Sequence, residues 1–193
     1  ALAAAGFAVV VGYNRSADAA TALAARLPGG TAQGHVALAA PVTDSAALAT
    51  LAQQVGGRLG RADVLVNCAG ITRFVPHADL DGLDDALADA ILATNVRGPL
   101  AATRALLPLL KKSPLPGGGV VVNISSIAGV TAMGSNLMYC ASKAALESLT
   151  RTWATEFGPQ GVRVNSVAPG PTSTPNLCPG CAPCGAGSTR IRL

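Results

Sequence analysis

Short apolar, β-branched runs alternate along this chain with longer segments whose apolar residues recur at helical spacing. This alternation is typical of repeated βαβ units and predicts an α/β fold with a parallel sheet. Right-handed crossovers then place helices on both faces of a doubly wound sheet. The predicted strands are Phe7–Val11, Val36–Ala39, Val64–Val66, Gly119–Ile124 and Arg163–Val167.

Capping residues and Gly/Pro stops set the predicted helix boundaries. Ser16 and Asp18 favour a helix through Leu27, and Asp44 with Ser45 favours a second helix to about Leu59. Two more helices are predicted, Leu80–Leu110 with an interruption near Gly98-Pro99, and Leu137–Phe157.

Composition excludes several classes of protein. Only 12% of the residues are charged and 50% are hydrophobic, with 38 alanines and 22 glycines, so disorder is excluded and close helix–sheet packing is favoured. The uncharged stretches 113–142 and 164–189 are broken by prolines and polar residues, and we predict no membrane span, no secretory signal and a cytoplasmic location. The net charge of +4 includes Arg190 and Arg192, and the chain has no basic cluster with interleaved aromatics, so nucleic-acid binding is not expected.

Three of the five cysteines, Cys178, Cys181 and Cys184, crowd the C-terminal tail. A closed zinc site requires four ligands, and His35 and His77 are far away in sequence. We therefore predict no metal site and an irregular tail over residues 176–193.

Ser126, Tyr139 and Lys143 form the most informative group of polar residues. Tyr139 and Lys143 are four residues apart, so they share one face of a helix, where an ammonium group favours the phenolate form of its neighbour. Ser126 follows the fourth predicted strand, at the sheet end where parallel α/β proteins bind ligands. A Tyr–Lys pair alone is more often part of a solvated helix face.

Four motifs in order resolve this ambiguity: Asn67-Cys-Ala-Gly70, Asn123-Ile-Ser-Ser126, Tyr139-Cys-Ala-Ser-Lys143 and the segment ending in Pro169-Gly170. Together they resemble the short-chain dehydrogenase/reductase family over about residues 2–175. The resemblance implies a partial NAD(P)-binding domain of Rossmann type over residues 1–175. The run Asp63–Arg73 is similar to the corresponding stretch of 3-oxoacyl-acyl-carrier-protein reductases.

The resemblance implies a catalytic role for four residues. Tyr139 would donate its proton to the substrate carbonyl oxygen, and Ser126 would hydrogen-bond that oxygen. Lys143 would lower the phenol pKa and hold the nicotinamide ribose. Asn95, within the long predicted helix, matches the asparagine that kinks this helix in the family and anchors a water that relays protons to Lys143.

The cofactor residues also follow from the resemblance. An acidic residue after the first predicted strand would favour NAD(H), but Gly12–Ser16 contains none and Arg15 can pair with a 2′-phosphate, so NADP(H) is preferred, with NAD(H) as the alternative. The predicted cofactor-binding residues are Arg15, Val42, Asn67, Ala69, Gly70, Tyr139, Lys143, Pro169, Gly170, Thr172 and Thr174.

Three departures from the family pattern qualify these expectations. The phosphate-binding glycine-rich loop is absent, and Ala1–Gly6 has the pattern of a closing helix turn, which predicts the loss of the first, central strand. Pro41 replaces the Asp or Asn that commonly bonds adenine, and the family's last strand is missing after Pro175. We therefore expect a chain truncated at both ends.

The resulting functional hypothesis is an NADP(H)-dependent oxidoreductase acting on a carbonyl or secondary alcohol, with a 3-oxoacyl thioester as one candidate substrate. The alternative is a non-catalytic fragment that acts only as a partner subunit. The resemblance also implies a homodimer or homotetramer formed through the two long helices. Their apolar residues either supply that interface or pack in the core; they are Leu106, Leu109, Leu146, Leu149 and Trp153.

Overall fold

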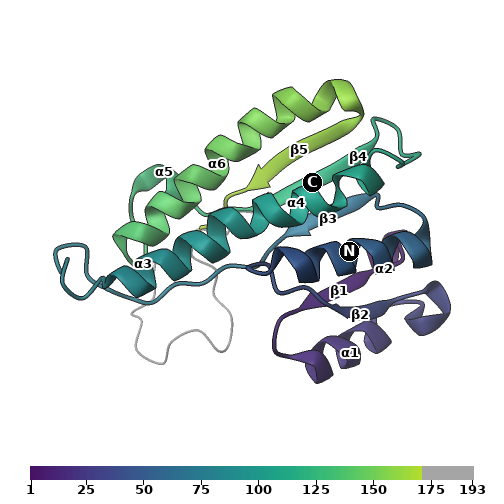
Figure 1. Ribbon diagram of the computed structural model, residues 1–193, viewed down its shortest axis with the longest axis horizontal. Helices are drawn as coiled ribbons and strands as arrows, with labels where there is room; N and C mark the ends of the chain where they lie inside the picture. Colours follow the sequence, from purple (N-terminus) through teal and green to yellow (C-terminus); the bar gives the residue numbers. More distant parts are fainter. Residues whose placement is uncertain (171–193) are drawn as a thin grey trace.

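The computed structural model describes residues 1–170, and its paired strands are all parallel. The strands form two sheets. β1 (Val10–Tyr13) pairs with β2 (Val36–Ala39), whereas β3 (Val64–Asn67), β4 (Gly119–Ile124) and β5 (Val162–Val167) form a sheet in the order β3-β4-β5. Because β1 lies beside β3, the order across the molecule is β2-β1-β3-β4-β5 (Figure 1).

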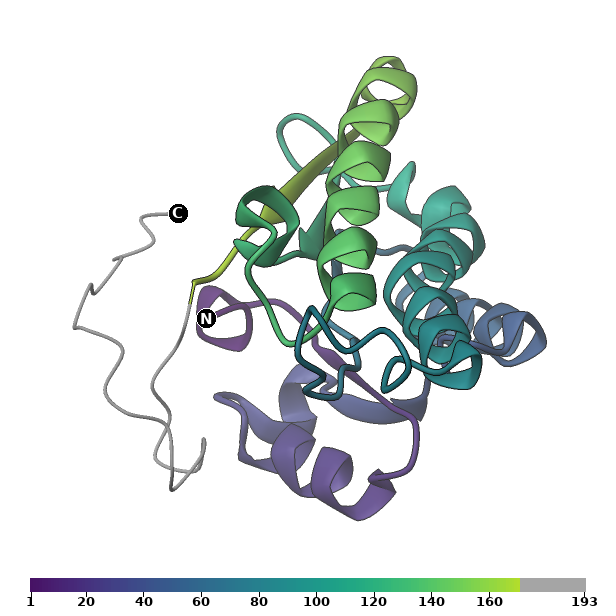
Figure 2. The ribbon, with the colours of Figure 1, turned by 90° about the vertical axis from the view of Figure 1, so that its left-hand side faces the viewer.

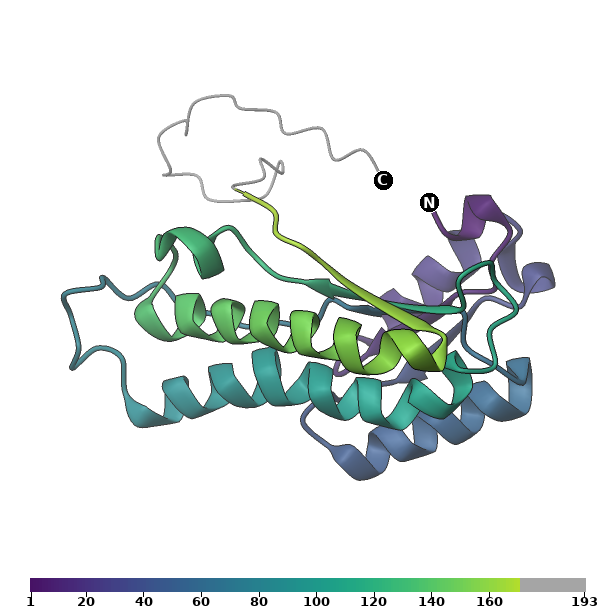
Figure 3. The ribbon, with the colours of Figure 1, turned by 90° about the horizontal axis from the view of Figure 1, so that it is seen from above.

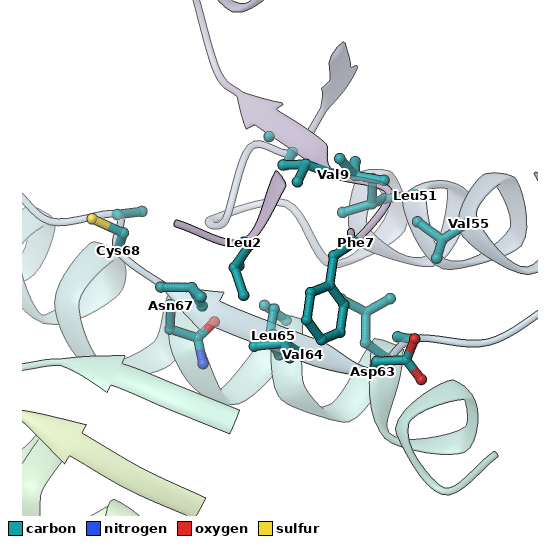
Figure 4. Close-up of a pocket in the computed structure, with 18 of the residues that line it drawn as sticks. Leu2, Phe7, Val9, Leu51, Val55, Asp63, Val64, Leu65, Asn67 and Cys68 are labelled. Atoms are coloured by element: carbon teal, nitrogen blue, oxygen red, sulfur yellow. The ribbon is translucent and has the colours of Figure 1, made fainter. Parts of the chain in front are cut away.

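A gap separates the two sheets. Within the described residues no backbone hydrogen bond joins β1 to β3, and a cavity of about 1000 Å³ lies between them. Leu2 and Phe7 project into this cavity opposite Val64 and Leu65 (Figure 4). The gap lies where the family resemblance places a central strand.

Helices cover both faces, as the sequence predicts. α2 (Ser45–Leu59), α4 (Gly98–Leu110) and α6 (Leu137–Phe157) form a layer on one face, and α1 (Ala17–Arg26) lies on the other with the short η1 (Ala3–Ala5) (Figure 3). The α/β class is thereby confirmed. The remaining elements are η2 (Gly30–Gln33), α3 (Asp85–Leu92), the π-helical η3 (Ala93–Arg97), α5 (Ala128–Thr131) and η4 (Gly158–Gln160).

The core lies between the sheets and the layer of α2, α4 and α6. The core residues come from both sheets and from these helices. The α2 helix, which supplies several of them, begins at an N-cap, where the Asp44 carboxylate accepts hydrogen bonds from the amides of Ala46 and Ala47 at 2.9 and 3.0 Å. Of the five apolar residues on the two long helices that could form either an oligomer interface or the core, four are buried: Leu106, Leu109, Leu146 and Trp153. Leu149 is half-buried. Their burial within the single chain supports packing in the core.

Several predicted boundaries differ from the structure, and two of them differ by three residues or more. The first strand begins at Val10 rather than Phe7, because the amide of Val9 donates to the His35 ring (3.0 Å) before pairing with β2 begins. The long helix begins at Asp85 rather than Leu80, since the Asp84 carboxylate accepts a hydrogen bond from the Leu87 amide (2.8 Å) and caps the helix there.

Candidate active site

The predicted catalytic residues gather at the carboxyl ends of β3 and β4. Figure 2 looks onto this end, where α5, the start of α6 and the segment between β3 and α3 lie close together. Ligands bind at this end of parallel α/β sheets. The fold therefore places the polar motifs of the sequence in the region where a binding site is expected.

Tyr139 and Lys143 lie on the same face of α6, as their spacing predicts. The Lys143 ammonium nitrogen is 5.7 Å from the centre of the Tyr139 ring, within cation–π range. Tyr139 is half-buried, so its phenol stays accessible, while only 5% of Lys143 is exposed. The arrangement places a buried ammonium group beside a partly exposed tyrosine.

Lys143 is also fixed to the sheet. Its Nζ donates a hydrogen bond of 2.8 Å to the carbonyl of Ile124 at the end of β4, and Ser125 Oγ donates to the Lys143 carbonyl at 3.3 Å. Burial lowers the pKa of Lys143 below its ordinary value, and the electrostatic interaction with the neighbouring Cys68 opposes part of this shift. The backbone and side chain of Lys143 are therefore both held at the end of β4.

Ser126 is the second residue after β4 and is half-buried. Its Oγ accepts a hydrogen bond of 3.2 Å from the amide of Ala128. The Ile127 amide donates to the Pro169 carbonyl at 3.0 Å, which ties this loop to the segment after β5. Among residues 1–170 the Ser126 hydroxyl donates no hydrogen bond, so its proton is available to a ligand oxygen.

Asn95 lies at the centre of a π-helical turn between α3 and α4 and is fully buried. Its Oδ1 accepts from the Ile71 amide (2.8 Å), and its Nδ2 donates to the Ile71 carbonyl (3.0 Å) and to Ser142 Oγ (3.1 Å). Ser142 Oγ in turn donates to the Tyr139 carbonyl at 2.7 Å. Asn95 thus connects the segment after β3 to the helix that carries Tyr139, and π-turns of this kind are frequent at functional sites.

Gly70 lies between Asn95 and Lys143. A β-carbon at this position would lie 3.5 Å from Asn95 Oδ1 and 3.7 Å from Lys143 Nζ. The structure therefore brings three predicted residues, Asn95, Gly70 and Lys143, into one cluster, with Tyr139 on the adjoining turn of α6.

Part of the predicted cofactor site lines the cavity between the two sheets. Val42, Ala69 and Gly70 line it, whereas the exposed Arg15 follows β1 next to the lining residue Asn14. The Asn67 side chain instead joins a buried network: its Nδ2 donates to Asn123 Oδ1 at 2.8 Å and to Thr103 Oγ1 at 3.2 Å. The side-chain nitrogen of Asn67 is therefore engaged within the protein.

These residues fit the nucleoside ends of a nicotinamide dinucleotide. Val42, Ala69 and Gly70 present small or apolar surface at the cavity between the two sheets. The pyrophosphate has no corresponding site among residues 1–170, because no helix there begins at a glycine-rich turn beside the cavity. Residues 1–170 therefore contain only some of the residues predicted to bind the cofactor.

Some predicted residues fall outside the described range. Thr172, Thr174 and the cysteines of the tail lie beyond residue 170, while Pro169 and Gly170 are the last two residues described. Among residues 1–170, no group of three or more His, Cys, Asp or Glu side chains is arranged to hold a metal ion.

Two polar residues of the site were not predicted from the sequence, Ser142 and Asn136. Asn136 caps α6, with its Oδ1 accepting from the Tyr139 amide at 2.7 Å. An asparagine just before a helical segment is a recognised N-cap signal, so the sequence contained the information to find it. Ser142 has no comparable local signal.

Comparison with known proteins identifies the family. The model of the short chain dehydrogenase family matches residues 1–179. The chain belongs to the short-chain dehydrogenase family. Members of this oxidoreductase family use nicotinamide cofactors, NAD or NADP.

Relatives of the family differ in substrate. A 3-oxoacyl-acyl-carrier-protein reductase of Synechocystis is 37% identical over 172 residues, 88% of this chain and 66% of the reductase. A D-threitol dehydrogenase of Mycolicibacterium smegmatis is 35% identical over 160 residues, 83% of this chain and 59% of the dehydrogenase. This member of the short-chain dehydrogenase family therefore spans slightly less than two thirds of the length of these relatives.

Solved structures of the same family match the fold. The crystal structure of a short-chain dehydrogenase from Streptomyces avermitilis gives a TM-score of 0.77 at 36% identity, covering 91% of this chain and 60% of that chain.

None of the helices within residues 1–170 combines the length and apolar character that a bilayer span requires.

Proposed function

We propose that this short-chain dehydrogenase interconverts a carbonyl and a secondary alcohol with NADP(H), with Tyr139 as the proton donor. The observation that carries the proposal is the position of the Lys143 ammonium, 5.7 Å from the Tyr139 ring and hydrogen-bonded to the end of β4. A positive charge at this distance stabilises the phenolate that remains after proton transfer. The half-buried Ser126 is the second hydroxyl at the same sheet end.

In the reduction, the chain's own residues hold the carbonyl and supply the proton. Ser126 Oγ donates a hydrogen bond to the carbonyl oxygen, and Tyr139 Oη transfers its proton to that oxygen as the C–H bond forms. Lys143 stabilises the tyrosinate that is left, and Asn95 holds the Tyr139 carbonyl through Ser142. A bound nicotinamide dinucleotide supplies the hydride.

We propose a 3-oxoacyl thioester as the first substrate to test and NADP(H) as the preferred cofactor. The relative from Synechocystis is named for 3-oxoacyl reduction, and the exposed Arg15 follows β1 where a 2′-phosphate would lie. Turnover of acetoacetyl-CoA is measured with NADPH and with NADH from the loss of absorbance of the reduced cofactor. This experiment tests both the substrate and the cofactor preference. The variant Arg15→Asp should move the preference toward NADH, and a wild-type preference for NADH would refute the choice of NADP(H).

The variant Tyr139→Phe tests the proton donor. We expect turnover to fall about a hundredfold or more while the Kd of NADPH stays within about twofold, because the hydroxyl acts in proton transfer. Equal turnover by Tyr139→Phe would contradict the proposal.

A second candidate function is a subunit that binds cofactor only together with a partner chain. The separation of the two sheets and the missing pyrophosphate site within residues 1–170 favour it. Titration of the purified 193-residue chain with NADPH distinguishes the two: saturable binding supports the enzyme, and its absence supports the partner-dependent subunit.

A further inference from the structure

Asn136 lies directly before α6 and only 1% of its surface is exposed. Its Oδ1 accepts a hydrogen bond of 2.7 Å from the backbone amide of Tyr139. The first amides of a helix have no partner within the helix, so a capping oxygen fixes their position. Asn136 therefore fixes the backbone amide of Tyr139 itself.

The other end of the Asn136 amide reaches a different part of the site. Its Nδ2 donates to the Arg73 carbonyl at 2.7 Å and to Thr72 Oγ1 at 3.2 Å. Two further contacts join the same segments, since the Val75 amide donates to the Ser135 carbonyl at 2.8 Å and the hydroxyls of Thr72 and Ser135 hydrogen-bond. The segment that follows Gly70 is thus bound to the first turn of α6.

The pattern of donors and acceptors is specific to asparagine. Its oxygen must accept from an amide while its nitrogen donates to a carbonyl and a hydroxyl. Serine reproduces the acceptor, but it lacks the two donor hydrogens. Aspartate reproduces the acceptor and would place a negative charge against the Arg73 carbonyl.

We infer that Asn136 is a positioning residue for Tyr139, which it ties to the segment carrying Ala69 and Gly70. The inference rests on the proposed role of Tyr139 as proton donor. Ser142 holds the Tyr139 carbonyl and Asn136 holds its amide, so the peptide groups on both sides of Tyr139 are fixed. A displacement of about 1 Å at a reacting group is enough to lower a rate about a hundredfold.

The kinetic test compares Asn136→Ala with Asn136→Ser in the full chain, with acetoacetyl-CoA and NADPH. We expect Asn136→Ala to lower kcat about ten- to a hundredfold with little change in KM, and Asn136→Ser to recover part of the loss because it keeps the cap. The matched control is Asp44→Ala, which removes the cap of α2, a helix without predicted catalytic residues, and should keep kcat within about twofold. A folded Asn136→Ala with wild-type kcat would overturn the inference.

A second readout does not depend on turnover. The chain has two tyrosines, so protein labelled with ¹⁵N-tyrosine gives two amide signals, from Tyr13 and Tyr139. Asn136→Ala should speed hydrogen exchange of the Tyr139 amide about tenfold or more and leave Tyr13 unchanged, whereas Asn136→Ser should preserve protection. Unchanged exchange at Tyr139 would overturn the inference, while a wild-type chain without turnover would refute the proposed function instead.

If Asn136→Ala does not fold, Asn136→Ser decides the question. It keeps the bond to the Tyr139 amide but loses the bonds to Arg73 and Thr72, so kcat should fall about three- to tenfold with the Tyr139 amide still protected. A wild-type kcat in Asn136→Ser would then refute the tie to the segment after Gly70.

Discussion

At the scale of single residues, the site depends on a lysine kept away from water. Lys143 is 5% exposed and has one hydrogen-bond partner for its ammonium group in the described structure, the Ile124 carbonyl. Burying a charge costs free energy unless it is compensated. Burial of the Lys143 ammonium beside Tyr139 therefore lowers the free energy of unfolding.

This cost has a defined pH dependence. Because burial lowers the pKa of Lys143, the unfolded chain still binds the proton at pH values where the folded protein has released it. The free energy of unfolding should therefore rise with pH between the folded pKa and the ordinary value of 10.5, and this group should have no effect on the slope below that window. Urea unfolding of wild type and of Lys143→Met across this pH range measures the effect. The free energy of unfolding of wild type minus that of Lys143→Met should increase with pH. Parallel curves would contradict the prediction, and Lys112→Met, at an exposed lysine, is the matched control.

A glycine beside Lys143 gives a second prediction. A β-carbon at Gly129 would lie 2.8 Å from the backbone nitrogen of Ala144 and 2.8 Å from the carbonyl carbon of Lys143. Gly129→Ala should lower the free energy of unfolding by about 1–3 kcal/mol, because α5 must move away from α6. Gly57→Ala is the control: this helical glycine has open space around its β-position, so the same substitution should stabilise by about 0.5–1 kcal/mol. Urea denaturation of both variants checks the signs, and a neutral Gly129→Ala would show that α5 is not tightly packed.

At the scale of elements, the sequence predicts regular structure well where periodicity and caps agree. The strands Val36–Ala39 and Gly119–Ile124 and the helix Leu137–Phe157 have the boundaries expected from their patterns. The prediction was wrong at Phe7–Val9, where the His35 ring bonds the Val9 amide across 26 residues. Hydrogen bonds between a side chain and a backbone group far away in sequence leave no periodic pattern in the sequence. For the same reason the predicted site contained Tyr139 and Lys143 but lacked Ser142.

The π-turn at Ala93–Arg97 is held in place by the side chain of Asn95. Asn95 satisfies the amide and the carbonyl of Ile71, and both partners lose their bonds in Asn95→Ala. Leaving such groups unsatisfied costs about 1–3 kcal/mol each, so we expect the free energy of unfolding to fall by roughly 2 kcal/mol or more. Chemical denaturation measures this loss. Asn165→Ala, at an exposed position of β5, should change stability by less than about 0.5 kcal/mol, and an equal effect of both variants would contradict the prediction.

At the scale of the whole molecule, the two sheets differ in how firmly they are held. β4 has hydrogen-bonded neighbours on both sides and contains the fully buried Val121, whereas β1 has one neighbour and faces the cavity. Strands with fewer buried contacts open more readily. We expect backbone amides of Val10–Tyr13 to exchange about tenfold or more faster than those of Val121–Asn123 in native-state hydrogen exchange. Equal protection of the two strands would show that both sheets open only when the whole molecule unfolds.

Within residues 1–170, no strand pairs with the edges of β1 and β3 that face each other. Neither Val10–Tyr13 nor Val64–Asn67 contains a lysine or a proline, the residues that commonly block foreign strands from a sheet edge. A net charge of +4 gives only modest repulsion between molecules. We therefore expect self-association of this chain to begin with the addition of a strand from another molecule at the edge of β1 or β3.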